Sequence, residues 1–410
     1  MEKIVNRLNG YAELLLRSGV NLQKGQMLVV ECSVERADFA RLCTEKAYGM
    51  GCSEVLVRWQ DDFVARSRFL HAADAVFDKV HPWDADFYNG ISAQGAAFLA
   101  IRAGDPENLA GVDASRIRRA QTASGRALAP FRERETSNAF PWCVCAAAGK
   151  KWAEKVYPGF SENEAEERLW RAILKASYSD RGDALENWKK HSDELHKRTK
   201  KLTALRLKTL HYKNALGTDL HVELPEGHFW AGGDEKCKNG VMFSANIPSE
   251  EVFTLPKKTG VNGVVYASRP LSLNGNLIEG IRFELKAGKI ISVRADRGEA
   301  ILRDAVAIDA GASYFGEVAL VPYDSPISNE KTLFYSTLFD ENASCHFAFG
   351  EAYPCIEGAE NMSRAEIEAR GANFSVTHVD FMVGTPDLTI IGETADGRAI
   401  DIFRAGNFAI

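Results

Sequence analysis

The apolar residues in the first third of the chain alternate between helical spacing and short continuous runs. A helix over 1–20 is predicted from the spacing of Ile4, Leu8, Tyr11 and Leu15, and a buried strand from the apolar run 27–30. The same patterns predict further helices over 36–48 and 115–127, and strands over 54–59, 97–101 and 142–145. Because parallel strands need crossover connections, strands separated by helices predict a mostly parallel sheet.

The pattern changes after a highly charged helical stretch over 161–210. From about residue 206 onward the apolar residues alternate over short runs separated by Gly and Asn, as at 220–224 and 263–266, and a helix is expected over 363–370. We therefore predict an α/β N-terminal domain with a mostly parallel sheet over 1–205, with a substrate-gating or assembly role. An α+β, strand-rich, metal-binding catalytic domain is predicted over 206–410.

Length and charge support this division and exclude several classes of protein. A chain of 410 residues is long for one hydrophobic core, and a net charge of -6 argues against nucleic-acid binding. No apolar stretch is long enough to cross a membrane, and the N-terminal segment is a charged amphipathic helix rather than a signal peptide. The 8 cysteines include no Cys-x-x-Cys pair. We therefore expect a cytoplasmic protein with reduced thiols.

The chain lacks the sequence motifs of two common enzyme classes. The loop after the first strand, 31–36, contains no glycine, so the backbone could not approach a dinucleotide pyrophosphate closely. The chain also lacks the Gly-x-Ser-x-Gly pentapeptide of the serine hydrolases that carry a nucleophile elbow. A nucleotide-dependent oxidoreductase is therefore disfavoured.

Carboxylates and imidazoles gather in four short segments of the second half. His378 and Asp380 lie in an apolar segment where strand period would place both on one face. On their own they could be a hydrogen-bonded core pair. Glu317 follows Gly316 in an apolar stretch, where a buried carboxylate needs a cation or hydrogen bonds.

Two more segments complete the set. His346 lies between Cys345 and Phe347, and could alone be a core histidine; Glu250 and Glu251 are adjacent. Three carboxylates and two imidazoles together suit two divalent ions of the zinc, cobalt or manganese type, sharing a carboxylate and a water.

At these residues the sequence resembles the aminopeptidase T family of metallo-aminopeptidases, which includes the aminopeptidase S and PepS-type enzymes. The resemblance is collinear over essentially the whole chain and most specific in five ordered motifs of the second half. These motifs are Glu250–Thr254, Gly316–Pro322, Ser325–Ser328, Leu338–His346 and His378–Gly384.

The resemblance implies a set of metal ligands and a catalytic hydroxyl. The ligands are Glu251, Glu317, His346, His378 and Asp380, and the hydroxyl is that of Tyr353. Spacing within the family favours Glu251 over Glu250 as the ligand. Glu250 or Glu317 is then expected to carry a proton to the leaving amine, while Tyr353 donates a hydrogen bond to the oxyanion.

The expected function is that of a hydrolase, a metalloprotease that removes N-terminal residues from peptides through a metal-activated bridging water. Asp340 or Glu341 is a candidate to bind the free α-ammonium, although either could instead cap a turn. The resemblance also implies a homodimer. The alternative is a non-catalytic peptide-binding protein with a structural metal.

Overall fold

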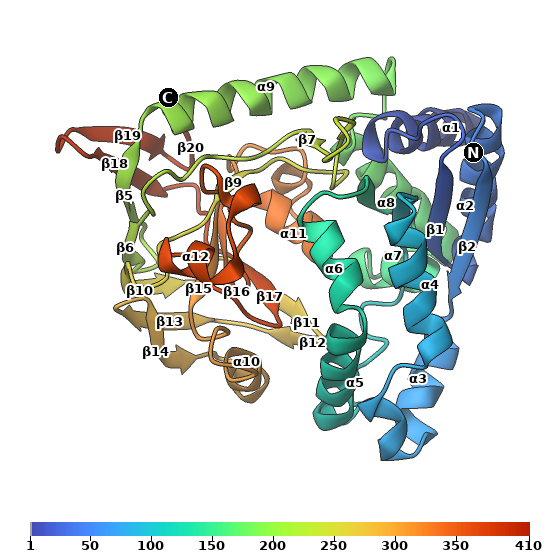
Figure 1. Ribbon diagram of the computed structural model, residues 1–410, viewed down its shortest axis with the longest axis horizontal. Coiled ribbons are helices and arrows are strands. Elements are labelled where there is room, and N and C mark those ends of the chain that lie inside the picture. Colours follow the sequence, from blue (N-terminus) through green and yellow to red (C-terminus); the bar gives the residue numbers. More distant parts are fainter. Residues whose placement is uncertain (1) are drawn as a thin grey trace. The chain divides into compact units, whose positions relative to one another are not determined.

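A computed structural model describes residues 2–410 and, within the first helix, side chains from Asn6 onward. Of the helix predicted over 1–20, only Met1 lies outside the described residues. The chain divides into two compact units (Figure 1). Unit 1 comprises Met1–His191 and Asp234–Ser249, and unit 2 comprises Ser192–Gly233 and Glu250–Ile410. The predicted ranges 1–205 and 206–410 stay a prediction.

Unit 1 contains a four-stranded parallel sheet in the order β2-β1-β3-β4. Its strands are β1 (Met27–Ser33), β2 (Glu54–Gln60), β3 (Ala97–Arg102) and β4 (Trp142–Ala146). Each coincides with a predicted strand, because continuous runs of apolar residues mark strands that are covered on both faces.

Helices pack on both faces of this sheet. On one face, Phe98 of β3 contacts Phe131 with ring centroids 5.1 Å apart. On the other face, Cys143 of β4 lies against Gly19, where a Cβ atom would be 3.0 Å from the Cys143 sulfur. The helices of unit 1 are α1 (Glu2–Leu14), a π-helical turn (Leu15–Gly19), α2 (Ala37–Gly49), α3 (Asp62–His71), α4 (Pro82–Ala93), α5 (Ala114–Ala127), α6 (Ala129–Thr136), α7 (Lys150–Val156) and α8 (Glu162–Ala176). Helix α9 (Ala184–Ala204) begins in unit 1 and ends in unit 2.

Residues 234–249 extend the parallel sheet from far along the sequence. The Val144 amide of β4 donates to the Ala245 carbonyl at 2.8 Å, and the Ile247 amide donates to the Val144 carbonyl at 3.0 Å. This segment also carries the short strands β7 (Glu235–Lys236) and β8 (Met242–Phe243). The association is long-range, and the local sequence pattern gives no indication of it.

Unit 2 contains two larger antiparallel sheets and a two-stranded one formed by β11 (Leu271–Leu273) and β12 (Asn276–Ile278). The largest has eight strands in the order β14-β13-β10-β6-β5-β18-β19-β20. Its strands are β5 (Leu207–Lys213), β6 (Asp219–Glu223), β10 (Val261–Tyr266), β13 (Arg282–Lys286), β14 (Lys289–Arg294), β18 (Thr389–Thr394), β19 (Ala399–Arg404) and β20 (Asn407–Phe408). The helix predicted to run to residue 210 ends at Ala204, because Arg206 has a positive φ of 46° and strand β5 begins at Leu207.

The smaller sheet of unit 2 has the order β17-β16-β15-β9. Its strands are β9 (Val252–Thr254), β15 (Phe315–Leu320), β16 (His346–Gly350) and β17 (His378–Met382). The two sheets pack face to face through aromatic side chains. The ring centroids of Tyr212 and Phe347 are 4.9 Å apart, and those of Phe283 and Phe381 are 5.0 Å apart.

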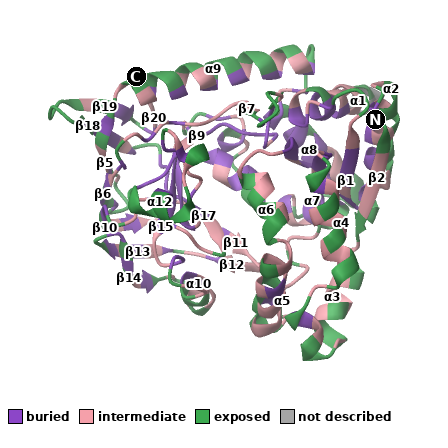
Figure 2. Ribbon diagram, viewed as in Figure 1, coloured by how far each residue is buried: buried purple, intermediate pink, exposed green. Residues whose placement is uncertain are grey.

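The remaining elements of unit 2 are short. They are β11 (Leu271–Leu273), β12 (Asn276–Ile278), α10 (Glu299–Val306), α11 (Thr337–Asp340) and α12 (Arg364–Ala369). In Figure 2 the strands of the small sheet are mostly buried, whereas many residues of α9 are exposed. None of the helices in the described part of the chain is long and apolar enough to span a membrane. The predicted fold class, a parallel α/β part followed by a strand-rich α+β part, is confirmed.

Candidate metal centre

The small sheet of unit 2 has an apolar face and a polar face. In β16, Phe347 belongs to the core shared with the large sheet, which leaves His346 on the opposite face. In β17, Phe381 belongs to the same core, so Asp380 and His378 lie opposite it. The period-two spacing that predicted a shared face for His378 and Asp380 is therefore present in the structure.

A β-bulge brings Glu317 onto the polar face. Phe315 is part of the core, and in a regular strand a residue two positions later would share its direction. The pairing of β15 with β16 shifts between Phe315 and Glu317, with Gly316 as the extra residue. A Cβ atom at Gly316 would lie 2.2 Å from the Glu351 carbonyl oxygen and 2.5 Å from that of Gly350, so this position requires glycine.

Strand register aligns the ligand-type side chains across the sheet. Ala348, in the middle strand, pairs with Glu317 on one side and Asp380 on the other. Its methyl group is small, so the two carboxylates can converge above it. Glu251 comes directly before β9 and points away from Val252, which belongs to the core.

Glu251, Glu317 and His346 form the first close group. His346 Nε2 lies 3.1 Å from Glu251 Oε2 and 3.4 Å from Glu317 Oε1. The three residues offer ligand atoms within 4.8 Å of one another. All three side chains are at least nine-tenths buried, with exposed fractions of 10%, 7% and 1% for Glu251, Glu317 and His346.

Glu317 also belongs to a second group, with His378 and Asp380. His378 Nε2 lies 3.7 Å from Glu317 Oε2 and 3.1 Å from Asp380 Oδ1. The two oxygens of Glu317 therefore face different imidazoles, Oε1 toward His346 and Oε2 toward His378.

Backbone carbonyls orient both imidazoles. His346 Nδ1 lies 3.2 Å from the Ser344 carbonyl oxygen, and His378 Nδ1 lies 2.8 Å from that of Glu351. Because a carbonyl only accepts hydrogen bonds, Nδ1 carries a proton and donates it in this hydrogen bond. Nε2 of each ring then faces the carboxylates, which is the arrangement that histidine ligands of metals commonly have.

The buried carboxylates form no ion pair with a lysine or an arginine among the described residues. Among the ion pairs of the described residues, Glu251, Glu317 and Asp380 pair only with imidazoles. Burial raises the pKa of Glu317 above its usual value, although its hydrogen bond to His346 opposes this effect. Buried negative charge of this density requires a compensating cation.

The pKa values of the two imidazoles also show that the site favours positive charge. Burial lowers the pKa of His346, but its hydrogen bonds to Glu251 and Glu317 outweigh burial and raise it well above the usual range. Burial likewise opposes charging of His378, whereas the charge of Asp380 and a hydrogen bond to it raise the pKa of His378 to about 10. Carboxylates and imidazoles are the ligand types that zinc, cobalt and manganese accept, so the donor set fits divalent metal.

Comparison with known proteins identifies the family. The family model described as "Thermophilic metalloprotease (M29)" matches residues 4–408. The chain belongs to the M29 family. It is 45% identical over 410 residues to aminopeptidase AmpS of Bacillus subtilis (strain 168) and 40% identical over 417 residues to aminopeptidase T of Thermus aquaticus, with 100% of both chains covered in each case.

A solved structure is similar throughout. The M29 chain matches wild-type AmpT from Thermus thermophilus with a TM-score of 0.91 and 40% identity, covering 99% of this chain and 100% of that one. The predicted resemblance to the aminopeptidase T family is confirmed.

The remaining predicted residues of this M29 protein lie near the two groups. Tyr353 follows β16, and its ring centroid is 5.8 Å from that of His378 and 6.0 Å from that of Phe253. Glu250 is buried, and its backbone amide donates a hydrogen bond to Asn342 Oδ1 at 2.7 Å. Glu251, rather than Glu250, is in the group with Glu317. The assignment of ligands stays a prediction.

Asp340 and Glu341 differ in their surroundings. Asp340 accepts hydrogen bonds from the amides of Phe334 at 2.8 Å and Ser336 at 3.0 Å, one on each carboxylate oxygen, so it closes a turn. Glu341 instead forms a third close group with His346 and Asp380. Glu341 was not among the metal ligands predicted from the sequence.

Burial raises the pKa of Glu341 well above its usual value, and the charges of Asp380 and Glu251 raise it further. Glu341 follows the short helix α11 directly, and its nearness to His346 depends on how the chain returns into β16. The only indication in the sequence is its place in the motif that ends at His346.

Proposed function

We propose that this M29 protein is a metal-dependent aminopeptidase that releases N-terminal residues from peptides at a two-metal centre. The metalloprotease family and full-length identity to proteins named aminopeptidases support this activity and disfavour a non-catalytic peptide-binding protein. The observation that carries the two-metal proposal is the position of Glu317, whose two oxygens face two different imidazoles.

In this proposal Glu251, Glu317 and His346 hold one ion, while Glu317, His378 and Asp380 hold the other. Bound divalent ions would lower the pKa of a water molecule and polarise the carbonyl of the first peptide bond. The protein's own contribution is to fix the ligands. The bulge at Gly316 aims Glu317, and backbone carbonyls fix both imidazoles.

Proton transfer and oxyanion binding are assigned to neighbouring side chains. The buried carboxylate of Glu250 or Glu317 would take a proton from the attacking water and deliver it to the leaving amine. Tyr353 would donate its hydroxyl proton in a hydrogen bond to the tetrahedral oxyanion. The contact between the Tyr353 and His378 rings supports a position at the edge of the centre.

We assign recognition of the substrate's free α-ammonium to Glu341. Both oxygens of Asp340, the other candidate, already accept backbone amides. Glu341 lies beside His346 and Asp380, and among the described residues no lysine or arginine forms an ion pair with it. A carboxylate in this position favours a positively charged substrate end, which is what distinguishes an exopeptidase from an endopeptidase.

The identity of the metal ions, the cellular location and the oligomeric state also belong to this proposal. The ions would be zinc, cobalt or manganese, because oxygen and imidazole nitrogen ligands suit all three. We propose a cytoplasmic location, supported by the 8 buried cysteines, which form no disulfide in the described part of the chain. A homodimer is proposed from the family resemblance, and an assembly or substrate-gating role for the α/β part stays a prediction.

The activity is tested with a pair of substrates that differ only at the N-terminus. Purified protein with zinc or cobalt should release leucine from Leu-Gly-Gly, followed by mass spectrometry, and should leave N-acetyl-Leu-Gly-Gly intact. Chelation should abolish the release, and added metal should restore it. Cleavage of the acetylated peptide, or full activity of chelated protein, would contradict the proposal.

A further inference from the structure

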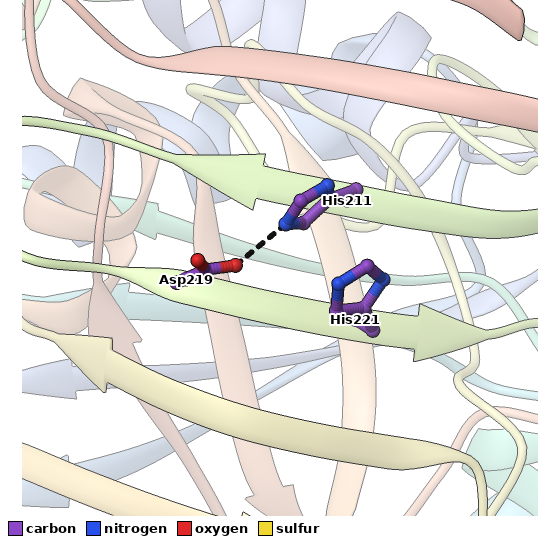
Figure 3. A group of neighbouring side chains, drawn as sticks. All are labelled: His211, Asp219 and His221. Carbon is purple, nitrogen blue, oxygen red and sulfur yellow. Dashed lines mark hydrogen bonds and ion pairs between the residues drawn. The ribbon is translucent and has the colours of Figure 1, made fainter.

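Three side chains with ligand atoms gather on the solvent-facing side of the eight-stranded sheet (Figure 3). His211 of β5 pairs directly with His221 of β6, and Asp219 precedes His221 by two residues on the same face. The imidazole centroids are 3.8 Å apart with 18° between the ring planes. His211 Nε2 lies 2.6 Å from Asp219 Oδ1, the contact drawn as a dashed line.

This cluster is separate from the M29 centre. The neighbours of His211 in β5, Leu210 and Tyr212, point to the opposite face and are buried in the core. Tyr212 packs against Phe347, which follows the ligand-type residue His346. The large sheet and the aromatic core therefore lie between the two sites.

Neighbouring strands hold the two histidines in place. Strand β5 lies between β6 and β18, with Ile391 paired to His211 on the far side. Strand β6 lies between β5 and β10, with Asn262 paired to His221. Ladder hydrogen bonds on both sides fix the backbone, so binding would reorder only side chains.

The charged groups around the cluster set its electrostatics. Lys213 Nζ lies 3.6 Å from Asp219 Oδ2, and Glu223 follows His221 by two residues on the same face, where it pairs with Lys257. Burial and the charge of His211 lower the pKa of His221. An imidazole that stays neutral keeps a lone pair for a cation, and two stacked rings disfavour a second proton.

We propose that His211, His221 and Asp219 form a surface site for one divalent transition-metal ion of the zinc type, separate from the M29 centre. Their ligand atoms lie within 4.8 Å of one another, so small side-chain rotations would bring them to about 2.0–2.1 Å from a shared ion. Two nitrogens and one oxygen suit zinc, with water completing the coordination.

Zinc binding to the full chain tests this site. Wild-type protein, a His211→Gln/His221→Gln variant and a His71→Gln control are dialysed against the same series of free zinc concentrations at pH 7.5. His71 is an exposed histidine at the end of α3, outside the cluster. The wild type and the control should bind one more zinc ion per chain than the double variant, while all three keep the same peptidase activity.

Two single variants move the affinity in opposite directions. Asp219→Asn should weaken binding of this ion by roughly tenfold or more, because it removes a ligand. Lys213→Gln should tighten it, because it removes a competing positive charge. Equal zinc content of the wild type and the double variant at every concentration would overturn the proposal, and so would unchanged affinity in Asp219→Asn.

Discussion

At the scale of single residues, Glu317 has the largest predicted effect. Glu317→Gln keeps the size of the side chain but removes the charge that both imidazoles face. We expect activity to fall by roughly a hundredfold or more, together with metal content. The matched control is Glu284→Gln on β13, whose carboxylate is 3.6 Å from Arg282. Peptidase assays and metal analysis of both variants check this, and a fully active Glu317→Gln would refute its role.

A variant of Glu341 distinguishes a role in substrate binding from a role in metal binding. If it recognises the α-ammonium, Glu341→Gln should raise KM for Leu-Gly-Gly and leave the metal content unchanged. Steady-state kinetics and metal analysis of the same sample distinguish this role from that of a ligand. Loss of metal in the variant would reassign Glu341 to the metal ligands.

The raised pKa values of the two imidazoles predict that metal binding depends on pH. The pKa of His378 is raised to about 10, so we expect this imidazole to carry a second proton in the metal-free protein at pH 7.5, and the pKa of His346 is raised in the same direction. Zinc must displace these protons, so its affinity should rise as the pH rises toward 10. Calorimetry at pH 7.5 in two buffers of different ionisation enthalpy should reveal proton release. Identical heats in both buffers would contradict it.

The proposed residues were predictable from the sequence to different extents. The shared face of His378 and Asp380 follows from strand period, because a strand with one buried face must place them together, whereas their role as ligands also needed the accompanying segments. Glu251 and Tyr353 rested on the family resemblance, since no local pattern distinguishes Glu251 from Glu250. Glu341 was predicted only as one of two candidates to bind the α-ammonium, because its closeness to His346 and Asp380 depends on tertiary packing after α11.

At the scale of secondary structure, the bulge in β15 is the feature that the sequence pattern did not reveal. Regular alternation would place Glu317 beside Phe315 in the core, and Gly316 is the residue that prevents this. The four parallel strands of unit 1 were predictable because their apolar runs are continuous. The pairing of 234–249 with β4 was not, because it joins segments about 100 residues apart in the chain.

Gly316→Ala should disturb both stability and the centre. The added Cβ would lie 2.2 Å from the Glu351 carbonyl oxygen, so strands β15 and β16 must move apart locally. We expect a loss of about 1–3 kcal/mol in the free energy of unfolding. A displacement of Glu317 by about 1 Å should lower activity by roughly a hundredfold.

Denaturant unfolding and peptidase assays measure both effects. The control is Gly125→Ala in α5, where no atom lies within 4 Å of the added Cβ and alanine favours the helix by up to about 1 kcal/mol. A Gly316→Ala variant as stable and active as the wild type would show that the bulge does not require glycine.

At the scale of the whole molecule, the similarity to the M29 aminopeptidases extends along the full chain, whereas the proposed metal centre lies in unit 2. All the predicted metal ligands belong to unit 2, where they lie on, or for Glu251 directly before, the strands of a single sheet that packs its other face on the eight-stranded sheet. This arrangement rests the ligands on a core of buried aromatic residues. A rigid support of this kind keeps ligands in place before metal binds.

The two-metal centre is tested most directly by anomalous diffraction at the zinc absorption edge from crystals of the zinc-loaded protein. Two neighbouring peaks are predicted, one between Glu251, Glu317 and His346, and one between Glu317, His378 and Asp380. A further peak between His211 and His221 would belong to the surface site. A single peak at the centre, or two peaks not bridged by Glu317, would contradict the proposed two-metal mechanism.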